Sequence, residues 1–399
     1  MNKRNGGTSG FVAICGVLTL LLAVNSFSTD TVAPGIPALR DFFSVDTSQA
    51  NLAFSVYVFT FGFMQLIYGP ISDRFGRRPV LVTGMALYCL ACLFCAFAPT
   101  FEMLLVGRAL QGGAASAAPA VARAVIRDLY GADGSRKVLS YVMSAFGLVA
   151  IATPIIGGFL VAWKGWQASF VFCAIYALIC IILIFSFLRE SRPSNAPARL
   201  ELRNIFLLYV RLTPNPLFAL NCATNLFMYA SMFVWLSGSM LVLIDGYAIE
   251  ARVAGFLLAL GSAGFMVGAW VSGRVGTQYS PNKLILLGSG IAILAALSIL
   301  IFALLGVRHG SAVALPAFVW MFGHGLHYPQ SMAGAVAPFP QNAGAASSLI
   351  GFYQTTAAAI MAFIMGLVHD GSAVPFGALM LILSIAALLA YLPFYRRFF

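Results

Sequence analysis

The chain of 399 residues has the composition of an integral membrane protein. Hydrophobic residues make up 61% of it and charged residues only 9%, against about 25% charged residues in ordinary soluble domains. A soluble core cannot hold so many apolar side chains without leaving large apolar patches on the surface. This excludes a soluble enzyme, a disordered tail and a nucleic-acid-binding module, although the formal net charge is +11.

Twelve apolar stretches are long enough to cross a bilayer, which takes about 20 residues. They cover residues 11–36, 51–70, 79–98, 102–123, 138–161, 167–188, 215–243, 253–275, 283–306, 312–336, 343–368 and 374–395. The predicted fold class is therefore all-α, with twelve transmembrane helices. The first stretch follows Lys3 and Arg4, and we interpret it as an uncleaved helix rather than a signal peptide because apolar sequence continues to Pro34.

The basic residues fall mostly on one side of the predicted membrane. Of the 23 Lys and Arg, 18 lie on that side and Arg108 lies within a span. The other side carries only Arg40, Lys164, Arg252 and Arg308. Basic loops stay in the cytoplasm, so both termini are predicted there. The positive charge thus indicates orientation rather than a nucleic-acid partner, and the short loops favour a bacterial inner membrane.

A polar, basic segment at 189–213 divides the chain into two halves, 1–188 and 214–399, and is predicted to be a cytoplasmic linker. The sequence I-S-D-R-F-G at 71–76 returns as V-S-G-R-V-G at 271–276, an offset of 200 residues. Each copy follows the second span of its half. This repeat predicts two six-helix bundles that arose by duplication, as in many secondary transporters.

The first span contains Asp30, the carboxylate that lies deepest in any predicted span. An acid at membrane depth has to be protonated, paired or placed in a wet cavity, which suits a proton carrier. The alternative is that Asp30 lies near the outer end of the span and caps a broken helix.

The loop after the second span reads G-P-I-S-D-R-F-G-R-R. This pattern resembles the signature loop of the major facilitator superfamily, a family of transporters built from two six-helix bundles. Asp73 is expected to pair with a cation from a later helix, and Gly69 to allow close helix packing. The resemblance implies a conformational role for these positions: Gly69, Asp73, Arg74, Gly76, Arg77 and Arg78.

The fourth span contains Arg108 in the sequence R-A-L-Q-G, which is similar to a motif of proton-driven members of that family. An Arg within a span is a functional candidate, unless it snorkels to the outer interface. The D-x-x-x-P arrangement from Asp30 to Pro34 resembles drug:proton antiporters of the bicyclomycin-resistance type, although Leu22 stands where some relatives have a second acid. We expect Asp30 and Arg108 to face each other and couple proton to substrate.

Two further motifs extend this resemblance. The fourth span ends in R-A-V-I-R-D-L-Y, in which Arg127 is either an inner-gate cation for a loop carboxylate such as Asp73 or part of a basic helix end. The fifth span contains T-P-I-I-G-G, similar to the antiporter motif with Thr in place of its first Gly. Pro154, Gly157 and Gly158 are expected to bend this helix and help the halves rock.

The tenth span contains His324 and His327 on one helix face. They mark a substrate or proton site, a zinc site that lacks an evident third ligand, or neutral imidazoles bonded to backbone. The segment 339–348 resembles the same antiporter group. Aromatic residues on spans expected to line a cavity, together with the two histidines, form the predicted substrate-binding set: Tyr57, Phe61, Tyr229, Phe233, Trp235, Trp320, His324, His327 and Tyr353.

The predicted function is proton-coupled export of lipophilic small molecules by a monomer, with the proton gradient as energy source and no cofactor or metal. The chain contains no Gly-Lys dipeptide and therefore no ATP-binding P-loop. Two alternatives stay open. One is an exporter or facilitator of a specific metabolite, such as a siderophore or a small anion. The other is an intramembrane enzyme or metal protein that uses the histidine pair.

Overall fold

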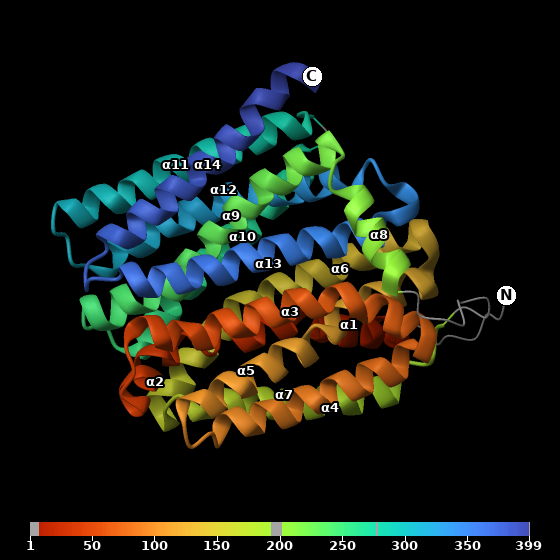
Figure 1. Cartoon of the computed structure of the whole chain (residues 1–399), viewed down its shortest axis with the longest axis horizontal. Helices are drawn as coiled ribbons and strands as arrows, with labels where there is room; N and C mark the ends of the chain where they lie inside the picture. The colour runs from red at the N-terminus through yellow and green to blue at the C-terminus, as the bar shows by residue number, and fades with distance from the viewer. Residues whose placement is uncertain (1–7, 193–201, 277, 399) are drawn as a thin grey trace.

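The computed structural model describes residues 8–192, 202–276 and 278–398, and these are helical almost throughout. Figure 1 shows long helices running side by side in two groups, α1 to α7 below and α9 to α14 above. The N-terminal group comprises α1 (Thr8–Thr29), η1 (Ala33–Gly35), α2 (Ile36–Phe43), α3 (Thr47–Phe75), α4 (Arg77–Ala96), α5 (Phe101–Ala115), α6 (Ala117–Lys164) and α7 (Gln167–Phe187). The C-terminal group, after α8 (Leu202–Leu212), comprises α9 (Pro216–Met240), η2 (Leu241–Gly246), α10 (Ala251–Val275), α11 (Pro281–Leu304), α12 (Gly310–Val336), η3 (Pro340–Asn342), α13 (Ala343–Val368) and α14 (Val374–Phe398).

Ten segments among the described residues are both long and apolar enough to cross a membrane. The two remaining predicted spans, the fourth and the tenth, are also helical but do not meet that criterion. The fourth is α5 continued by the first part of α6, with a break at Ser116. The tenth is α12, which has 27 residues but carries two His and two Pro. Together these twelve segments form the predicted all-α membrane fold.

Three predicted boundaries differ from the structure. The first span is not one helix, because α1 ends at Thr29 and prolines at 34 and 37 restart the chain as η1 and α2. The fourth span extends beyond residue 123, since α6 continues to Gly131, whose φ of 66° turns the chain into the fifth span. The segment 189–213 contains the helix α8.

Small residues bring the two halves together at two places. The helix α3 packs along α13, and the second arm of α6 packs along α10. At the second contact, a Cβ atom added to Gly158 would lie 2.6 Å from the carbonyl oxygen of Ala251 and 3.3 Å from the Cα atom of Gly255. The backbones thus touch where side chains are absent, which is typical of membrane helices.

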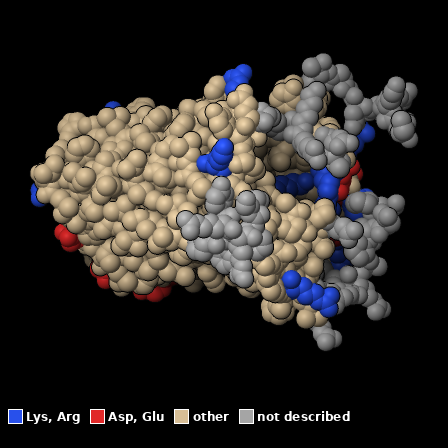
Figure 2. Space-filling model, turned by 90° about the horizontal axis from the view of Figure 1, so that it is seen from above, with Lys and Arg blue, Asp and Glu red and all other residues tan. Residues whose placement is uncertain are grey.

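The exposed surface is largely apolar. Side chains such as Leu90, Phe185, Leu294 and Ile382 are exposed, whereas polar residues such as Arg108 and Asn225 are buried. Figure 2 shows basic side chains gathered at one end of the molecule, where the surface is hollowed. We call the end that carries the loop 73–78 the basic end, and the end that carries α2 and η2 the opposite end. This distribution fits a lipid environment around the helices.

Candidate functional site

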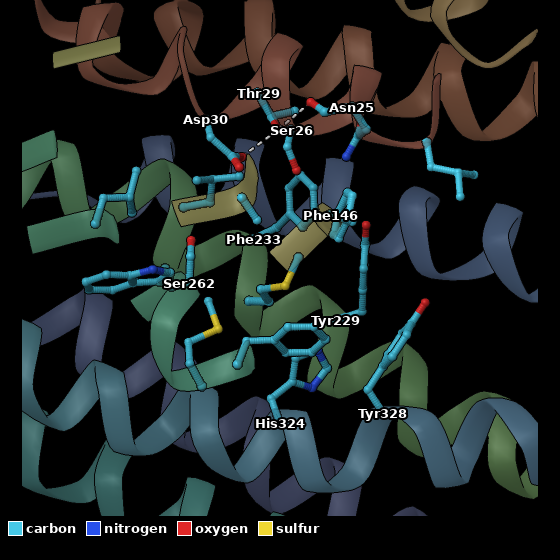
Figure 3. Close-up of a pocket in the computed structure, with 18 of the residues that line it drawn as sticks. Asn25, Ser26, Thr29, Asp30, Phe146, Tyr229, Phe233, Ser262, His324 and Tyr328 are labelled. Carbon is cyan, nitrogen blue, oxygen red and sulfur yellow. Dashed lines mark hydrogen bonds between the residues drawn. The ribbon is translucent and has the colours of Figure 1, made fainter. Parts of the chain in front are cut away.

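A cavity of about 260 Å³ lies between the two halves. It is lined by residues of α1, α6, α9, α10 and α12, so both halves contribute. Figure 3 shows Asn25, Ser26 and Thr29 projecting from one side toward His324 and Tyr328 on the other. Most of the lining is aromatic, aliphatic or thioether. Such a pocket with a few polar groups is typical of a small-molecule site.

Asp30 lines this cavity directly after the last residue of α1. Its carboxylate accepts hydrogen bonds from Thr29 Oγ1 at 2.7 Å and from Thr153 Oγ1 at 3.2 Å. Thr153 belongs to the second arm of α6, beside the kink residue Pro154. Asp30 therefore contacts the second arm of α6 while it lines the cavity, and it lies where α1 ends.

Arg108 is completely buried in the N-terminal half, so it does not snorkel to an interface. Its Nε donates to the Ala53 carbonyl at 2.8 Å and its Nη1 to Gln111 Oε1 at 2.5 Å. The guanidinium also lies 4.3 Å from the ring centroid of Tyr57, a cation–π contact.

The expected contact between Arg108 and Asp30 is not made. Arg108 approaches only as far as the Ser28 carbonyl, with Nη1 3.4 Å from that oxygen, and Asp30 instead binds hydroxyl groups. The reason is local: Arg108 finds its acceptors among backbone carbonyls and Gln111 behind α1, while Asp30 turns toward the cavity. Arg108 therefore positions the end of α1 rather than pairing with its acid.

The predicted aromatic set divides into two groups. Tyr229, Phe233, Trp235 and His324 line the cavity. The others lie elsewhere. Tyr57 is buried beside Arg108 of α5 and stacks with the buried Phe61. Trp320 donates to Ser384 Oγ at 2.9 Å, His327 lies near Thr224 Oγ1 at 3.0 Å, and Tyr353 lies near Thr213 Oγ1 at 3.1 Å. Whether such a residue faces the cavity depends on the rotation of its helix about the helix axis, which the sequence does not give.

The two histidines face different surroundings. His324 lines the cavity and stacks on Trp320 with ring centroids 5.4 Å apart. His327 is fully buried and contacts the Thr224 hydroxyl. The Nδ1 atom of each ring has no hydrogen-bond partner, so the expected bonds to backbone are not observed. Within the described parts of the chain, no three His, Cys, Asp or Glu side chains are arranged to hold a metal ion.

Sequence reasoning missed several cavity residues. Phe146 and Ser262 line the cavity without a sequence motif, whereas Tyr328 could have been found one helical turn after His324. Arg123 also lines the cavity and is exposed there, although it belongs to the R-A-x-x-R-D-L-Y motif that was assigned to a helix end.

The signature loop is held by charges at the basic end. Arg77 is buried and contacts Asp73 Oδ1 at 2.7 Å through Nη2 and Asp128 Oδ2 at 2.9 Å through Nε. The expected partner of Asp73 from a later helix is thus Arg77 of α4. Arg127 makes no ion pair with Asp73 in the described structure, because Arg77 already occupies that carboxylate and Arg127 extends toward Gly344.

Glu190, which sequence reasoning overlooked, closes the same loop. Its carboxylate accepts from the backbone N–H groups of Arg77 at 2.9 Å and Arg78 at 3.1 Å, at the start of α4. Partial burial raises the pKa of this carboxyl, but four backbone N–H donors outweigh that effect and lower the pKa below its ordinary value. The end of the sixth span is thereby fastened to the beginning of the third.

The glycines and the remaining arginines of the signature loop differ in their surroundings. Gly76 has φ of 99°, and a Cβ atom there would lie 2.8 Å from Glu190 Oε2, so glycine is required. Gly69, by contrast, has open space where a Cβ atom would stand, so the expected close packing is not observed. Arg74 lies over the ring of Phe75, and Arg78 donates to the Phe185 carbonyl.

The T-P-x-x-G-G motif lies at the contact between halves. Gly157 packs on the backbone of Thr31, where an added Cβ atom would lie 2.5 Å from the carbonyl oxygen. Gly158 packs on α10, as described above. On the same side of the molecule, Arg40 Nη1 of α2 lies 2.6 Å from Asp245 Oδ2 of η2, so an ion pair also joins the halves at the opposite end.

Comparison with known proteins agrees with this architecture. The model of the Major Facilitator Superfamily matches residues 18–363. The chain belongs to the major facilitator superfamily. It is 29% identical to "Multidrug resistance protein D" of Escherichia coli over 96% of this chain and 95% of that protein. It is 24% identical to the "Bicyclomycin resistance protein homolog" of Haemophilus influenzae over 98% and 97%, which confirms the resemblance inferred from the motifs.

Solved structures show the same fold. A bacterial homologue of the lysosomal transporter Spinster, in an inward-facing and unoccupied conformation, superposes with a TM-score of 0.75 at 14% identity, covering 98% of this chain and 99% of that one. A D-xylose-proton symporter superposes with a TM-score of 0.76 at 16% identity, covering 96% of each chain. At these sequence identities the similarity shows that the fold is shared, and it shows nothing about the substrate.

Proposed function

We propose that this protein exports lipophilic small molecules in exchange for protons. The observation that carries the proposal is Asp30, the carboxylate that lines the cavity between the halves. A carboxylate held by two hydroxyl groups in a largely apolar cavity loses its charge when a proton binds and attracts a cationic substrate when it is ionised, so proton and substrate compete for it. Relatives named for multidrug and bicyclomycin resistance support efflux as the direction of transport.

The transport cycle follows from these contacts. With the cavity open to the cytoplasm, substrate binds against ionised Asp30 and the aromatic lining. After the halves rock and the cavity opens outward, a proton protonates Asp30 and substrate leaves. The return movement carries that proton inward, where Asp30 releases it. Arg108 fixes the end of α1 throughout, because its hydrogen bonds to Ala53 and Ser28 join α3, α5 and α1.

The membrane arrangement belongs to the same proposal. Residues 1–188 and 214–399 form the two moving bundles, and 189–213 links them in the cytoplasm. The basic end faces the cytoplasm of a bacterium and both termini lie there, in keeping with the positive-inside rule. The protein acts as a monomer, catalyses no reaction and needs no cofactor besides the proton gradient. With Arg40 paired to Asp245 at the opposite end, the conformation is inward-facing.

Reconstituted vesicles with an imposed pH gradient test the proposal. Wild-type protein is expected to move lipophilic dyes and antibiotics against their gradient, and Asp30→Asn to lose this dependence on the pH gradient. Glu102→Gln provides the matched control, because Glu102 is an exposed acid in the first turn of α5, away from the cavity. Gradient-driven transport that survives Asp30→Asn would contradict the assignment of Asp30.

The alternative is a facilitator or exporter of a specific metabolite. It is favoured by His324, a polar residue that lines the cavity and whose buried Nδ1 has no hydrogen-bond partner. Transport that is indifferent to the pH gradient but lost in His324→Phe would support this second function over the first.

A further inference from the structure

The cavity between the halves holds two charged side chains of opposite sign, Asp30 and Arg123. Neither makes an ion pair anywhere in the described part of the chain, where the carboxylate binds hydroxyl groups and the ion pairs belong to other residues. Arg123 is exposed within the cavity, whereas Arg108 and Arg77 are buried among acceptors. Both charges are therefore available to a ligand.

The two charges stand at different depths. Asp30 lies toward the opposite end, since α2 and Arg40 follow it in the chain. Arg123 lies toward the basic end, since Asp128 is only five residues further along α6 and binds Arg77 of the signature loop. The lining residues of α1 run from Leu22 to Asp30, a rise of about 12 Å at 1.5 Å per residue.

Aromatic side chains fill the wall between the charges. The ring of Tyr229 lies 5.2 Å from Phe233 and 6.5 Å from Tyr328. Tyr229 is within electrostatic range of Asp30, and Tyr328 is within range of Arg123. In Figure 3, Tyr229 lies between Asp30 and Tyr328. The order along the wall is thus carboxylate, aromatic rings and guanidinium.

We propose that the cavity selects amphoteric aromatic molecules, which carry a basic amine at one end and an acidic group at the other. The amine binds Asp30, the acid binds Arg123, and the aromatic body packs on Tyr229, Phe233 and Tyr328. A molecule with one charge leaves the other protein charge unmatched in a largely apolar cavity, which is unfavourable. This inference rests on the proposed function and names the substrate class of the same site.

The charge balance of the cycle follows. The proton that binds Asp30 replaces the substrate amine, and no covalent bond changes. Export of a zwitterion, which has no net charge, against one proton moves one positive charge inward in each cycle. Export of a monocation against one proton moves none. A membrane potential therefore drives export of the zwitterion and leaves export of the monocation unaffected.

Three probes that share one ring system test the proposal. Norfloxacin carries a piperazine amine and a carboxylate at opposite ends, its ethyl ester keeps only the amine, and its N-acetyl derivative keeps only the acid. Binding to the purified protein is measured by fluorescence polarisation. We expect norfloxacin to bind about tenfold more tightly than either derivative, as one additional charge-assisted contact provides.

Substitutions of Arg123 separate the two ends of the ligand. Arg123→Gln is expected to weaken norfloxacin binding about tenfold and leave the ester unchanged, while Arg123→Lys retains much of the preference. Asp30→Asn is expected to weaken norfloxacin and the ester but not the N-acetyl derivative. Three results would overturn the proposal. Norfloxacin and the ester bind the wild type equally, norfloxacin does not bind at all, or Arg123→Gln weakens the binding of both probes equally.

Transport distinguishes failure of this inference from failure of the proposed function. In vesicles with a potassium-valinomycin potential and no pH gradient, potential-driven export of norfloxacin but not of the ester supports the inference. If a pH gradient drives both probes and the potential affects them equally, the efflux function stands and the zwitterion preference is wrong. If a pH gradient drives none of the three probes and the standard dyes also fail, the proposed function itself is wrong.

Discussion

The two copies of the repeated loop, residues 71–76 and 271–276, use different forces to hold the same backbone. Ser72 accepts a hydrogen bond from Arg77 Nη1 at 2.6 Å, and Ser272 accepts one from Gln330 Nε2 at 2.9 Å. Next to the first copy, the buried Arg77 adds ion pairs with the partly exposed Asp73 and with the buried Asp128 of α6. The second copy has no acid, and Arg274 lies 4.5 Å from the ring centroid of Trp270.

This difference shows which part of the duplicated loop the fold itself needs. The serine at the same position of each copy connects its helix to a neighbour, so the hydrogen-bonded scaffold is shared. The ion pairs of Arg77 belong to the first copy, in the half that also contains Asp30. We interpret the ionic loop as a conformational latch added to one half of a symmetric scaffold.

The largest expected effect is that of Arg77→Ala. The substitution leaves Asp128, whose side chain is only 6% exposed, without its cation, and removal of one partner from a buried pair destabilises by about 3–5 kcal/mol. Arg274→Ala, the substitution in the second copy, is expected to lower stability by about 1 kcal/mol or less because its cation–π contact is exposed. Denaturant unfolding in detergent measures both, and equal losses would remove the distinction between the loops.

The next effect concerns glycine. Gly76→Ala is expected to destabilise by about 2 kcal/mol, because an L-residue at φ of 99° is strained and its Cβ atom would press on the Glu190 carboxylate. Gly273 lies within α10 and has open space where a Cβ atom would stand. Gly273→Ala should therefore leave the stability of the protein unchanged or raise it by up to about 1 kcal/mol. The same unfolding experiment compares them, and a harmless Gly76→Ala would show that the loop relaxes easily.

The serines test the shared scaffold. Ser72→Ala and Ser272→Ala should each lower stability by about 1 kcal/mol, the usual contribution of a hydrogen bond. Similar losses of stability from the two substitutions would support a hydrogen-bonded scaffold that both copies share, with different additional contacts in each copy. A loss confined to Ser72→Ala would instead indicate that the second copy keeps its serine without depending on it.

The smallest effect is the pH dependence due to Glu190. Its pKa is lowered in the folded protein, so its contribution is present above the unfolded pKa of about 4.3 and is lost as the pH falls through the lower folded value. The contribution is expected to be under about 1 kcal/mol because the carboxylate is exposed. Melting temperatures of wild type and Glu190→Gln should therefore differ at neutral pH, and the difference should shrink as the pH falls below about 4, whereas a constant difference would contradict this account.

Much of the architecture could be predicted because hydrophobic runs of membrane length have few alternative structures. The same constraint made Asp30 a functional candidate, since an acid at membrane depth has to be protonated, paired or placed in a wet cavity, and in the structure it lines the cavity between the halves. The partners of Arg108 could not be predicted, because backbone carbonyls, Gln111 and the Tyr57 ring satisfied it as well as a carboxylate would. A sequence shows which side chain needs a partner but not which neighbour supplies it.

The assignment of aromatic residues failed for a related reason. Tyr57 and Tyr229 are equally plausible on composition, yet only Tyr229 faces the cavity, since a rotation of one helix by less than half a turn exchanges cavity, lipid and core faces. Arg123 was overlooked because a cation near a helix end resembles an ordinary basic loop residue. Its position opposite α12 depends on how the two halves meet, which a single span does not encode.

The seam between α6 and α10 has a pharmacological consequence. Pro154, Gly158 and Gly255 meet there through backbone atoms, at a contact that is not part of the cavity lining. A compound that wedged these two helices apart at the seam would act on the contact between the halves, whatever substrate the cavity holds. Substitution of cavity residues would leave the binding site of such an inhibitor unchanged, and bulkier residues at the seam would themselves hold the two halves apart.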